Sequence, residues 1–188
     1  MAASSRAALS ENQSGTARAT FHEASAFALH CSRAASHNGA YVASRAIIGK
    51  NLLVVHSTVP VTSVQELIAF GKAKPKFLNY ASSGVGATSF LSGEIFKPKT
   101  GVDMIHVPYK GAGEATAAVI AGQVHLIFSS PNALMPHAKT GRLRALGVTS
   151  ARRLPVISEV PTIAEAGLPG FEVNNCYGIL VPAKTPLS

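Results

Sequence analysis

Small polar residues and glycines gather at one point of the sequence, where an apolar stretch ends. Residues 80–90 read Tyr-Ala-Ser-Ser-Gly-Val-Gly-Ala-Thr-Ser-Phe. Backbone amides of such a loop can approach a ligand closely, and the start of a following helix adds partial positive charge. The pattern predicts a binding site for a small anion, with an ordinary strand-to-helix turn as the alternative. The candidate ligand-binding residues here are Ser82, Ser83, Gly84, Gly86, Ala87 and Thr88.

Nucleotide binding is disfavoured by the same segment. No lysine follows the glycines, as a P-loop would require, and residues 84–89 do not match the GxGxxG pattern of dinucleotide-binding folds. The predicted anion is therefore a small one, held by amides and hydroxyls.

Two further loops follow apolar runs in the same way. Residues 106–113 carry Tyr109, with a ring and a hydroxyl, then Lys110 and Gly111. Lys110 either attracts an acid or stays in solvent, so Tyr109 is the preferred contact. Residues 129–132 begin with Ser129 and supply hydroxyls and an amide, with helix capping as the alternative role. Because parallel strands end at one edge of a sheet, we expect these loops to be neighbours.

Residues for catalysis are hard to find. Asp103 is the only aspartate, no Gly-x-Ser-x-Gly motif occurs, and Cys31 and Cys176 belong to no CxxC pair. The histidines show no i, i+4 spacing with an acidic partner, which a metalloprotease-like zinc site would need. The sequence therefore predicts no catalytic residue, no metal site and no cofactor.

Charge and hydropathy narrow the class of partner. The chain of 188 residues carries 17 Lys and Arg against 9 Asp and Glu, a formal charge of +8. These basic residues are dispersed, and only Arg152 and Arg153 are adjacent, so no nucleic-acid partner is predicted. The positive balance suits an anionic ligand. No apolar run approaches the ~20 residues needed to cross a bilayer.

The elements that must position these loops follow an α/β pattern. From residue 47 onward, short apolar runs alternate with helical patterns and Gly- or Pro-bearing turns, which predicts a mostly parallel sheet flanked by helices. Capping boxes at Ser63 with Glu66 and at Thr162 with Glu165 predict two helix starts, and a third helix is expected over residues 87–97. The expected strands are residues 52–56, 78–81, 104–107, 124–128, 143–149 and 178–181.

The first part of the chain differs from the rest. Residues 1–46 are rich in Ala, Ser, Arg and His and show no sustained periodicity, and charged residues interrupt any export signal. We therefore expect an irregular or non-native segment at 1–46, an α/β ligand-binding lobe at 47–175 and a return strand at 176–188.

Residues 51–188 resemble the Bug receptors, the periplasmic solute-binding proteins of tripartite tricarboxylate transporters. The resemblance is carried by Leu-Val-Val-His at 53–56, Leu-Asn-Tyr-Ala-Ser-Ser-Gly at 78–84, Val-Pro-Tyr-Lys-Gly at 107–111 and the run at 161–171. It implies one lobe of a type II periplasmic-binding-protein fold, which closes like a Venus flytrap on a small organic carboxylate. It also implies a periplasmic location, membrane permease subunits as partners and no enzymatic activity.

Departures from the family bear on ligand choice and completeness. Phe90 stands where the family often has His, His125 where Asp is usual, and Cys176 where Trp is common. No second glycine-rich carboxylate loop is recognisable in residues 1–48, which predicts a truncated receptor whose start is either a shifted reading frame or a true variant. The alternatives are a non-functional fragment, the effector-sensing domain of a transcription regulator, and an enzyme on the same α/β plan.

Overall fold

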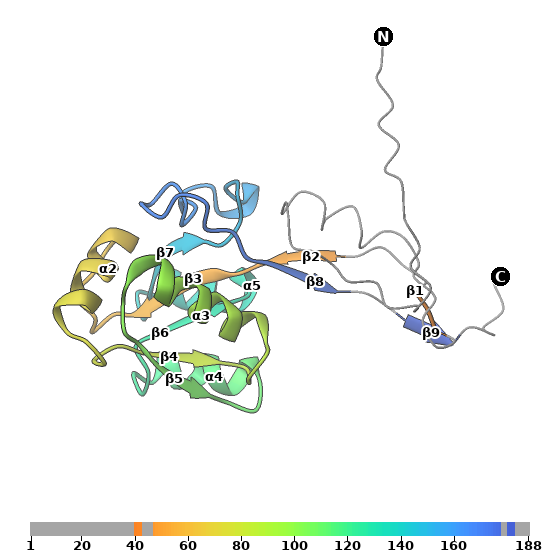
Figure 1. Ribbon diagram of the computed structural model, residues 1–188, viewed down its shortest axis with the longest axis horizontal. Coiled ribbons are helices and arrows are strands. Elements are labelled where there is room, and N and C mark those ends of the chain that lie inside the picture. Colours follow the sequence, from red (N-terminus) through yellow and green to blue (C-terminus); the bar gives the residue numbers. More distant parts are fainter. Residues whose placement is uncertain (1–39, 43–46, 178–179, 183–188) are drawn as a thin grey trace, which may run out of the picture.

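The computed structural model describes residues 40–42, 47–177 and 180–182. Its centre is a five-stranded sheet with helices on both faces (Figure 1). The strands lie in the order β5-β4-β6-β3-β7. Their bounds are β3 Leu52–His56, β4 Asn79–Ser82, β5 Ile105–Pro108, β6 Leu126–Ser129 and β7 Leu143–Val148. The helices are α2 Val64–Ala73, α3 Thr88–Thr100, α4 Ala112–Ile120 and α5 Pro131–Lys139, with a short 3-10 helix at Pro155–Ile157.

The expected α/β sheet flanked by helices is confirmed, and its strand pairings are mixed. β4 pairs parallel with β5 and β6, but β3 pairs antiparallel with both β6 and β7. The cause lies before β3, where strand β2 (Ile47–Lys50) is separated from it by Asn51 alone. β3 therefore enters the sheet at the edge where β6 ends, with Leu52 opposite Ser129. Four strands share one direction and β3 opposes them.

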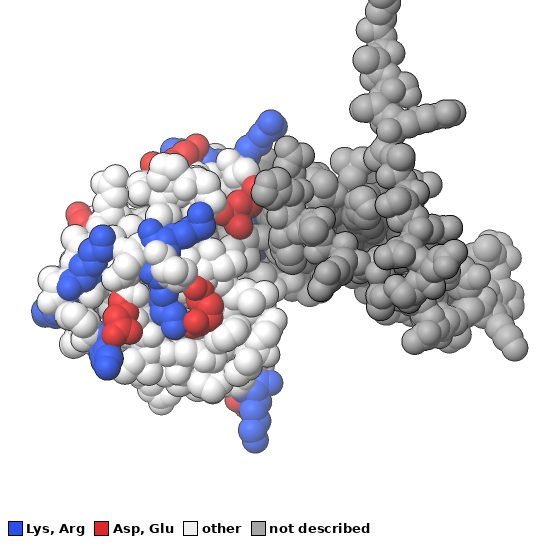
Figure 2. Space-filling model, viewed as in Figure 1, with Lys and Arg blue, Asp and Glu red and all other residues white. Residues whose placement is uncertain are grey.

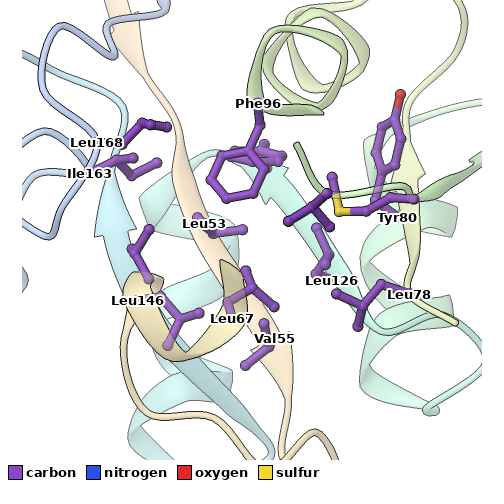
Figure 3. Packing of buried hydrophobic residues seen from close by; sticks show 14 of the residues in the cluster. Leu53, Val55, Leu67, Leu78, Tyr80, Phe96, Leu126, Leu146, Ile163 and Leu168 are labelled. Atoms are coloured by element: carbon purple, nitrogen blue, oxygen red, sulfur yellow. The ribbon is translucent and has the colours of Figure 1, made fainter. Parts of the chain in front are cut away.

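Two apolar layers hold the helices against the sheet. Along β3, Leu53 and Val55 face α2 and α3, while Leu52 and Val54 face α4 and α5, and all four are fully buried. A strand covered on both faces reads as a continuous apolar run, which is why residues 52–56 are recognisable in the sequence. The layer beneath α2 and α3, which contains Phe96, is shown in Figure 3.

The predicted capping hydrogen bonds form in part at Ser63 and in full at Thr162. Ser63 Oγ accepts from the amide of Glu66 at 3.2 Å, but the Glu66 carboxylate reaches the amide of Thr62 at 2.6 Å. That backbone hydrogen bond from Thr62 is the main reason that the pKa of Glu66 is lowered. Thr162 and Glu165 exchange both bonds at 3.0 Å, as a capping box requires.

The segment after Thr162 does not become a helix. It forms hydrogen-bonded turns that end at Gly167, which has a φ of +111°. In contrast, α3 is longer than expected. It continues past residue 97 to Thr100 and ends at Gly101, which has a φ of +71°. β3 has the predicted bounds, and the boundaries of the other predicted strands differ by at most two residues.

Two short antiparallel ribbons lie outside the central sheet. β2 pairs with β8 (Asn174–Tyr177), and β1 (Ala40–Val42) pairs with β9 (Leu180–Pro182). Figure 1 shows β2 and β8 extending from one side of the sheet. β1 lies inside the range that was expected to be irregular, and β9 overlaps the strand expected at 178–181, of which residues 178–179 lie outside the described part. None of the described helices is long and apolar enough to cross a membrane.

Close packing of α3 on β4 yields a stability prediction. A Cβ on Gly93 would lie 2.4 Å from the ring of fully buried Tyr80. We expect Gly93→Ala to lower the free energy of unfolding by about 1 to 3 kcal/mol, because neither the helix nor the ring can move freely. The measurement is urea denaturation.

Gly113 in α4 is the matched control, because a Cβ there would meet no atom within 4 Å. Gly113→Ala should leave stability unchanged or raise it by about 0.5 kcal/mol, since alanine is the better helix former. Equal effects of the two substitutions would contradict the packing argument.

Candidate functional site

The loops that follow β4 and β5 are neighbours, as expected from the sequence. Ser82 lies opposite Pro108 in the parallel pair, and the amide of Tyr109 donates to the carbonyl of Ser82 at 2.9 Å. β6 is the neighbour of β4 on the other side and ends at Ser129. The helices α3, α4 and α5 therefore all begin at the same edge of the sheet.

None of these three helices has a side-chain cap. The N-cap residues are Ala87, Gly111 and Ser130, and none makes a capping hydrogen bond to the first turn. The first amides of a helix have no partner within the helix and carry partial positive charge. Three such sets at one edge create a favourable environment for an anion.

A hollow of about 540 Å³ lies at this edge. It lies between the starts of α3 and α5, the end of β6 and the ribbon strands β2 and β8, and its volume is in the range of small-ligand sites. The residues that line it are Gly49, Lys50, Asn51, Ser83, Ala87, Thr88, Ser89, Ala112, Ile127, Phe128, Ser129, Ser130, Pro131, Asn132, Leu154, Val156 and Asn175.

The charge of this lining is one-sided. No Asp or Glu occurs among its described residues, and Lys50 is its one Lys or Arg. The visible face of the molecule in Figure 2 instead shows acidic and basic side chains interspersed. The lining thus contains amides, hydroxyls and one lysine, and it has no described carboxylate to repel an anion.

The structure brings some predicted site residues into the hollow and leaves others out. Among its described lining residues are four of them, namely Ser83, Ala87, Thr88 and Ser129. The other six lie beside or behind it and do not line it: Ser82, Gly84, Gly86, Tyr109, Lys110 and Gly111.

Ser82 holds the glycine loop from behind. It is fully buried, and its Oγ lies 2.7 Å from Nε2 of His106 and 3.2 Å from both the amide and the carbonyl of Gly84. Gly84 and Gly86 have φ values of +129° and +84°, which side chains other than glycine rarely adopt. Ser82, Gly84 and Gly86 therefore shape the loop, and Ser83 is the loop residue that faces the hollow.

Hydroxyl groups of the residues that line the hollow differ in whether they already form a hydrogen bond. Ser83 and Ser89 bond each other, with their Oγ atoms 3.1 Å apart and the amide of Ser83 donating to Ser89 Oγ at 3.1 Å. In contrast, no hydrogen bond from a described residue reaches the hydroxyls of Thr88 or Ser129, although only 8% of Ser129 is exposed. These two hydroxyls remain available to a ligand.

The residues of the second loop have structural roles. Tyr109 is partly buried and packs on the apolar layer beneath α4 and α5. Lys110 is exposed, and its amide donates to the carboxylate of Glu114 at 3.3 Å. Gly111 is the N-cap of α4. Tyr109 is not among the described lining residues of the hollow, so its direct contact with a ligand stays a prediction.

Sequence reasoning missed Lys50 of β2, Asn175 of β8 and Asn51, which lies between β2 and β3. Asn51 is buried, where its amide donates to Thr149 Oγ1 at 3.1 Å and its side chain approaches Ser92 Oγ at 3.5 Å. The one available signal was that a polar Lys-Asn pair directly precedes the buried run at 52–56.

A partly buried network of aromatic and charged side chains lies beside the loop on the side of α3. The ring of His106 lies 4.9 Å from Tyr80 and 4.8 Å from Phe90, and burial lowers its pKa. Tyr80 donates to Glu94 at 2.6 Å, and Glu94 pairs with Lys97 at 2.6 Å. Burial opposes ionisation of Glu94, but the hydrogen bonds from Lys97 and Tyr80 lower its pKa overall. The part of the chain that the structure describes contains no cluster of three metal-binding side chains.

Comparison with known proteins identifies the family. The family described as tripartite tricarboxylate transporter family receptor matches residues 37–188. The chain therefore belongs to this family of solute-binding receptors.

Solved structures agree with this assignment. Rpa4515 of R. palustris with adipate is 42% identical, with a TM-score of 0.71 over 74% of this chain and 46% of that one. MatC from Rhodopseudomonas palustris with bound malate is 31% identical, with a TM-score of 0.68 over 74% of this chain and 47% of that one. The periplasmic binding protein BugD is 28% identical, with a TM-score of 0.70 over 75% of this chain and 47% of that one. The fold is thus that of a periplasmic-binding-protein lobe.

The chain spans only part of its relatives. It covers 41% and 62% of the lengths of the first two curated proteins that it matches, and less than half of each of these three solved structures.

The histidine environments predict a pH dependence of stability. Burial lowers the pKa of His106 and of His125 below the ordinary 6.5, with Lys97 and His56 respectively adding to the effect and Glu94 opposing it at His106. The unfolded chain therefore takes up protons first, so stability is present above about pH 6.5 and declines as the pH falls below it. We expect the free energy of unfolding to be smaller at pH 5.5 than at pH 7.5 in urea titrations.

His106→Gln should reduce this decline, because the amide can still bond Ser82 but does not titrate. Direct NMR titration of the ring of His106 checks the cause. A midpoint at or above 6.5 in the folded protein would contradict it.

Proposed function

We propose that this chain is the ligand-binding lobe of a receptor that binds the carboxylate group of a small organic acid in the periplasm. The receptor then delivers the acid to the membrane subunits of a tripartite transporter, without covalent chemistry. The family assignment supports the class of protein, and the similarity to solved periplasmic binding proteins supports the location.

One observation carries the proposal: the hollow has no described acidic residue, and three uncapped helix starts meet there. The free hydroxyls of Thr88 and Ser129 add donors at its wall. Hydrogen bonds to an ionised group are roughly twice as strong as those between neutral groups, so a carboxylate gains more here than a neutral solute.

Two of the similar solved structures point to a dicarboxylate as the class of ligand. Two similar solved structures hold adipate and malate, both of which carry two carboxylates. We propose that this chain also binds a dicarboxylate, without assigning adipate or malate as its natural ligand. The described lining is partly apolar, through residues such as Leu154 and Val156, so it can also contact a short hydrocarbon segment.

Catalysis is disfavoured by how Ser82 and His106 are placed. Their 2.7 Å contact resembles a nucleophile with its base, but Ser82 is fully buried and its hydroxyl also bonds the Gly84 backbone. No substrate reaches that oxygen without unfolding the loop. We therefore assign the pair to the support of the binding loop.

Binding by this chain should be detectable and weak. The described residues supply one wall, and a site covered on one side buries less of its ligand than a closed cleft. We expect adipate to bind with a dissociation constant on the order of 1 mM or weaker, and to shift the amide NMR signals of Thr88, Ser89 and Asn132. Adipamide, of the same length but uncharged, should not shift them.

Ser129→Ala should weaken adipate binding about two- to tenfold, because it removes one available donor. Ser158→Ala, an exposed serine outside the described lining, is the matched control and should bind like the wild type. Shifts of equal size with adipamide, or none at the starts of α3 and α5 with adipate, would refute the proposed carboxylate site.

A further inference from the structure

Lys50 is the one charged residue in the described lining of the hollow. It lies at the end of β2, directly opposite Asn174 in the antiparallel pair with β8. The ion pairs among the described residues are Lys97 with Glu94 and Arg153 with Glu165, and neither involves Lys50. Its charge therefore has no carboxylate partner there.

The Lys50 ammonium group is nevertheless held in place. It donates to Oδ1 of Asn174, and Nδ2 of Asn174 donates to the carboxylate of Glu172 at 2.8 Å. An ammonium group needs an acceptor and a carboxylate needs a donor, so these two partners fix the orientation of the amide between them. A lysine has three N–H donors, and this bond uses one. Two remain to meet a ligand.

We propose that Lys50 binds the second carboxylate of a dicarboxylate whose first carboxylate lies at the starts of α3 and α5. This inference rests on the proposed function and deepens it. It implies that the lobe selects a ligand with two negative charges over a ligand with one. Helix starts and hydroxyls accept any carboxylate, whereas an ammonium group without a carboxylate partner favours a second negative charge.

Other cations near this edge do not serve the same purpose. Lys110 is exposed and does not line the hollow, and Arg153 already pairs with Glu165 at 2.8 Å. Lys50 also differs from both in its origin, because it comes from the β2–β8 ribbon and not from the loops that follow the sheet strands. The two ends of the ligand are thus held by separate elements.

The test compares adipate with its monomethyl ester, which has the same chain but a single charge. Wild-type protein should bind adipate more tightly, and Lys50→Gln should reduce that preference about three- to tenfold, the range of a partly exposed charge pair. The amide of glutamine can still donate to Asn174, so the ribbon is retained. Binding is followed by amide NMR titration of the full chain at low ionic strength.

Two variants make the comparison specific. Lys50→Arg keeps the charge and should keep the preference. Lys139→Gln removes the same charge from an exposed site at the far end of α5, about 13 Å of helix away from Ser130, and should also keep it. A urea titration of each variant verifies that it is folded.

The outcomes separate this inference from the proposed function. If both ligands shift the amides at the starts of α3 and α5 but Lys50→Gln keeps the full preference, the carboxylate site stands and the role of Lys50 is refuted. Loss of the preference in Lys139→Gln as well would also refute it, because net charge would then be the cause. If neither ligand shifts those amides, the carboxylate site itself is wrong, and the inference fails with it.

Discussion

The parallel pairing of β4 with β5 and β6 is the constraint on which the site depends. It places the ends of three strands side by side, so three helices begin within one small region. The pairing is secured by burial on both faces, since Tyr80 packs on one side of β4 and Ala81 on the other. In Figure 3 the Tyr80 hydroxyl points away from the apolar cluster, where it meets Glu94. The packing of the Tyr80 ring thus fixes the position of its polar hydroxyl group.

The helix starts show a division between stability and function. α2, which lies away from the hollow, has a serine cap and an acidic residue in its first turn. α3, α4 and α5 have no side-chain cap, and α3 and α5 also have no acidic residue in the first turn. A cap typically contributes about 1 kcal/mol, so its absence at three neighbouring helices leaves stabilisation unused. An anion bound at these amides would supply the missing acceptor.

The sequence predicts those parts of this arrangement whose residues are close together along the chain. The glycine loop, the neighbouring loop at 106–111 and the start of α3 follow from local patterns, because strand, turn and helix signals are adjacent along the chain. The direction of β3 and the position of Lys50 do not, because both depend on the pairing of β2 with β8, more than 120 residues later. Tyr109 was favoured for its chemistry, and the structure shows it partly buried against the apolar layer under α4 and α5. Local chemistry identifies a loop, and only the packing of the elements decides which of its residues line the hollow.

Phe90, one of the residues that depart from the family pattern, packs against the ring of His106 behind the glycine loop. Phe90 stands where the family often has a histidine, and its ring lies 4.8 Å from that of His106. A phenyl ring offers no hydrogen bond and contributes to the burial that lowers the pKa of His106. A neutral His106 adds no charge beside the glycine loop, and it keeps Nε2 at Ser82, whose hydroxyl holds Gly84. In the proposed site, the positive charge would then come from the helix starts and Lys50, which line the hollow, and not from His106 behind it.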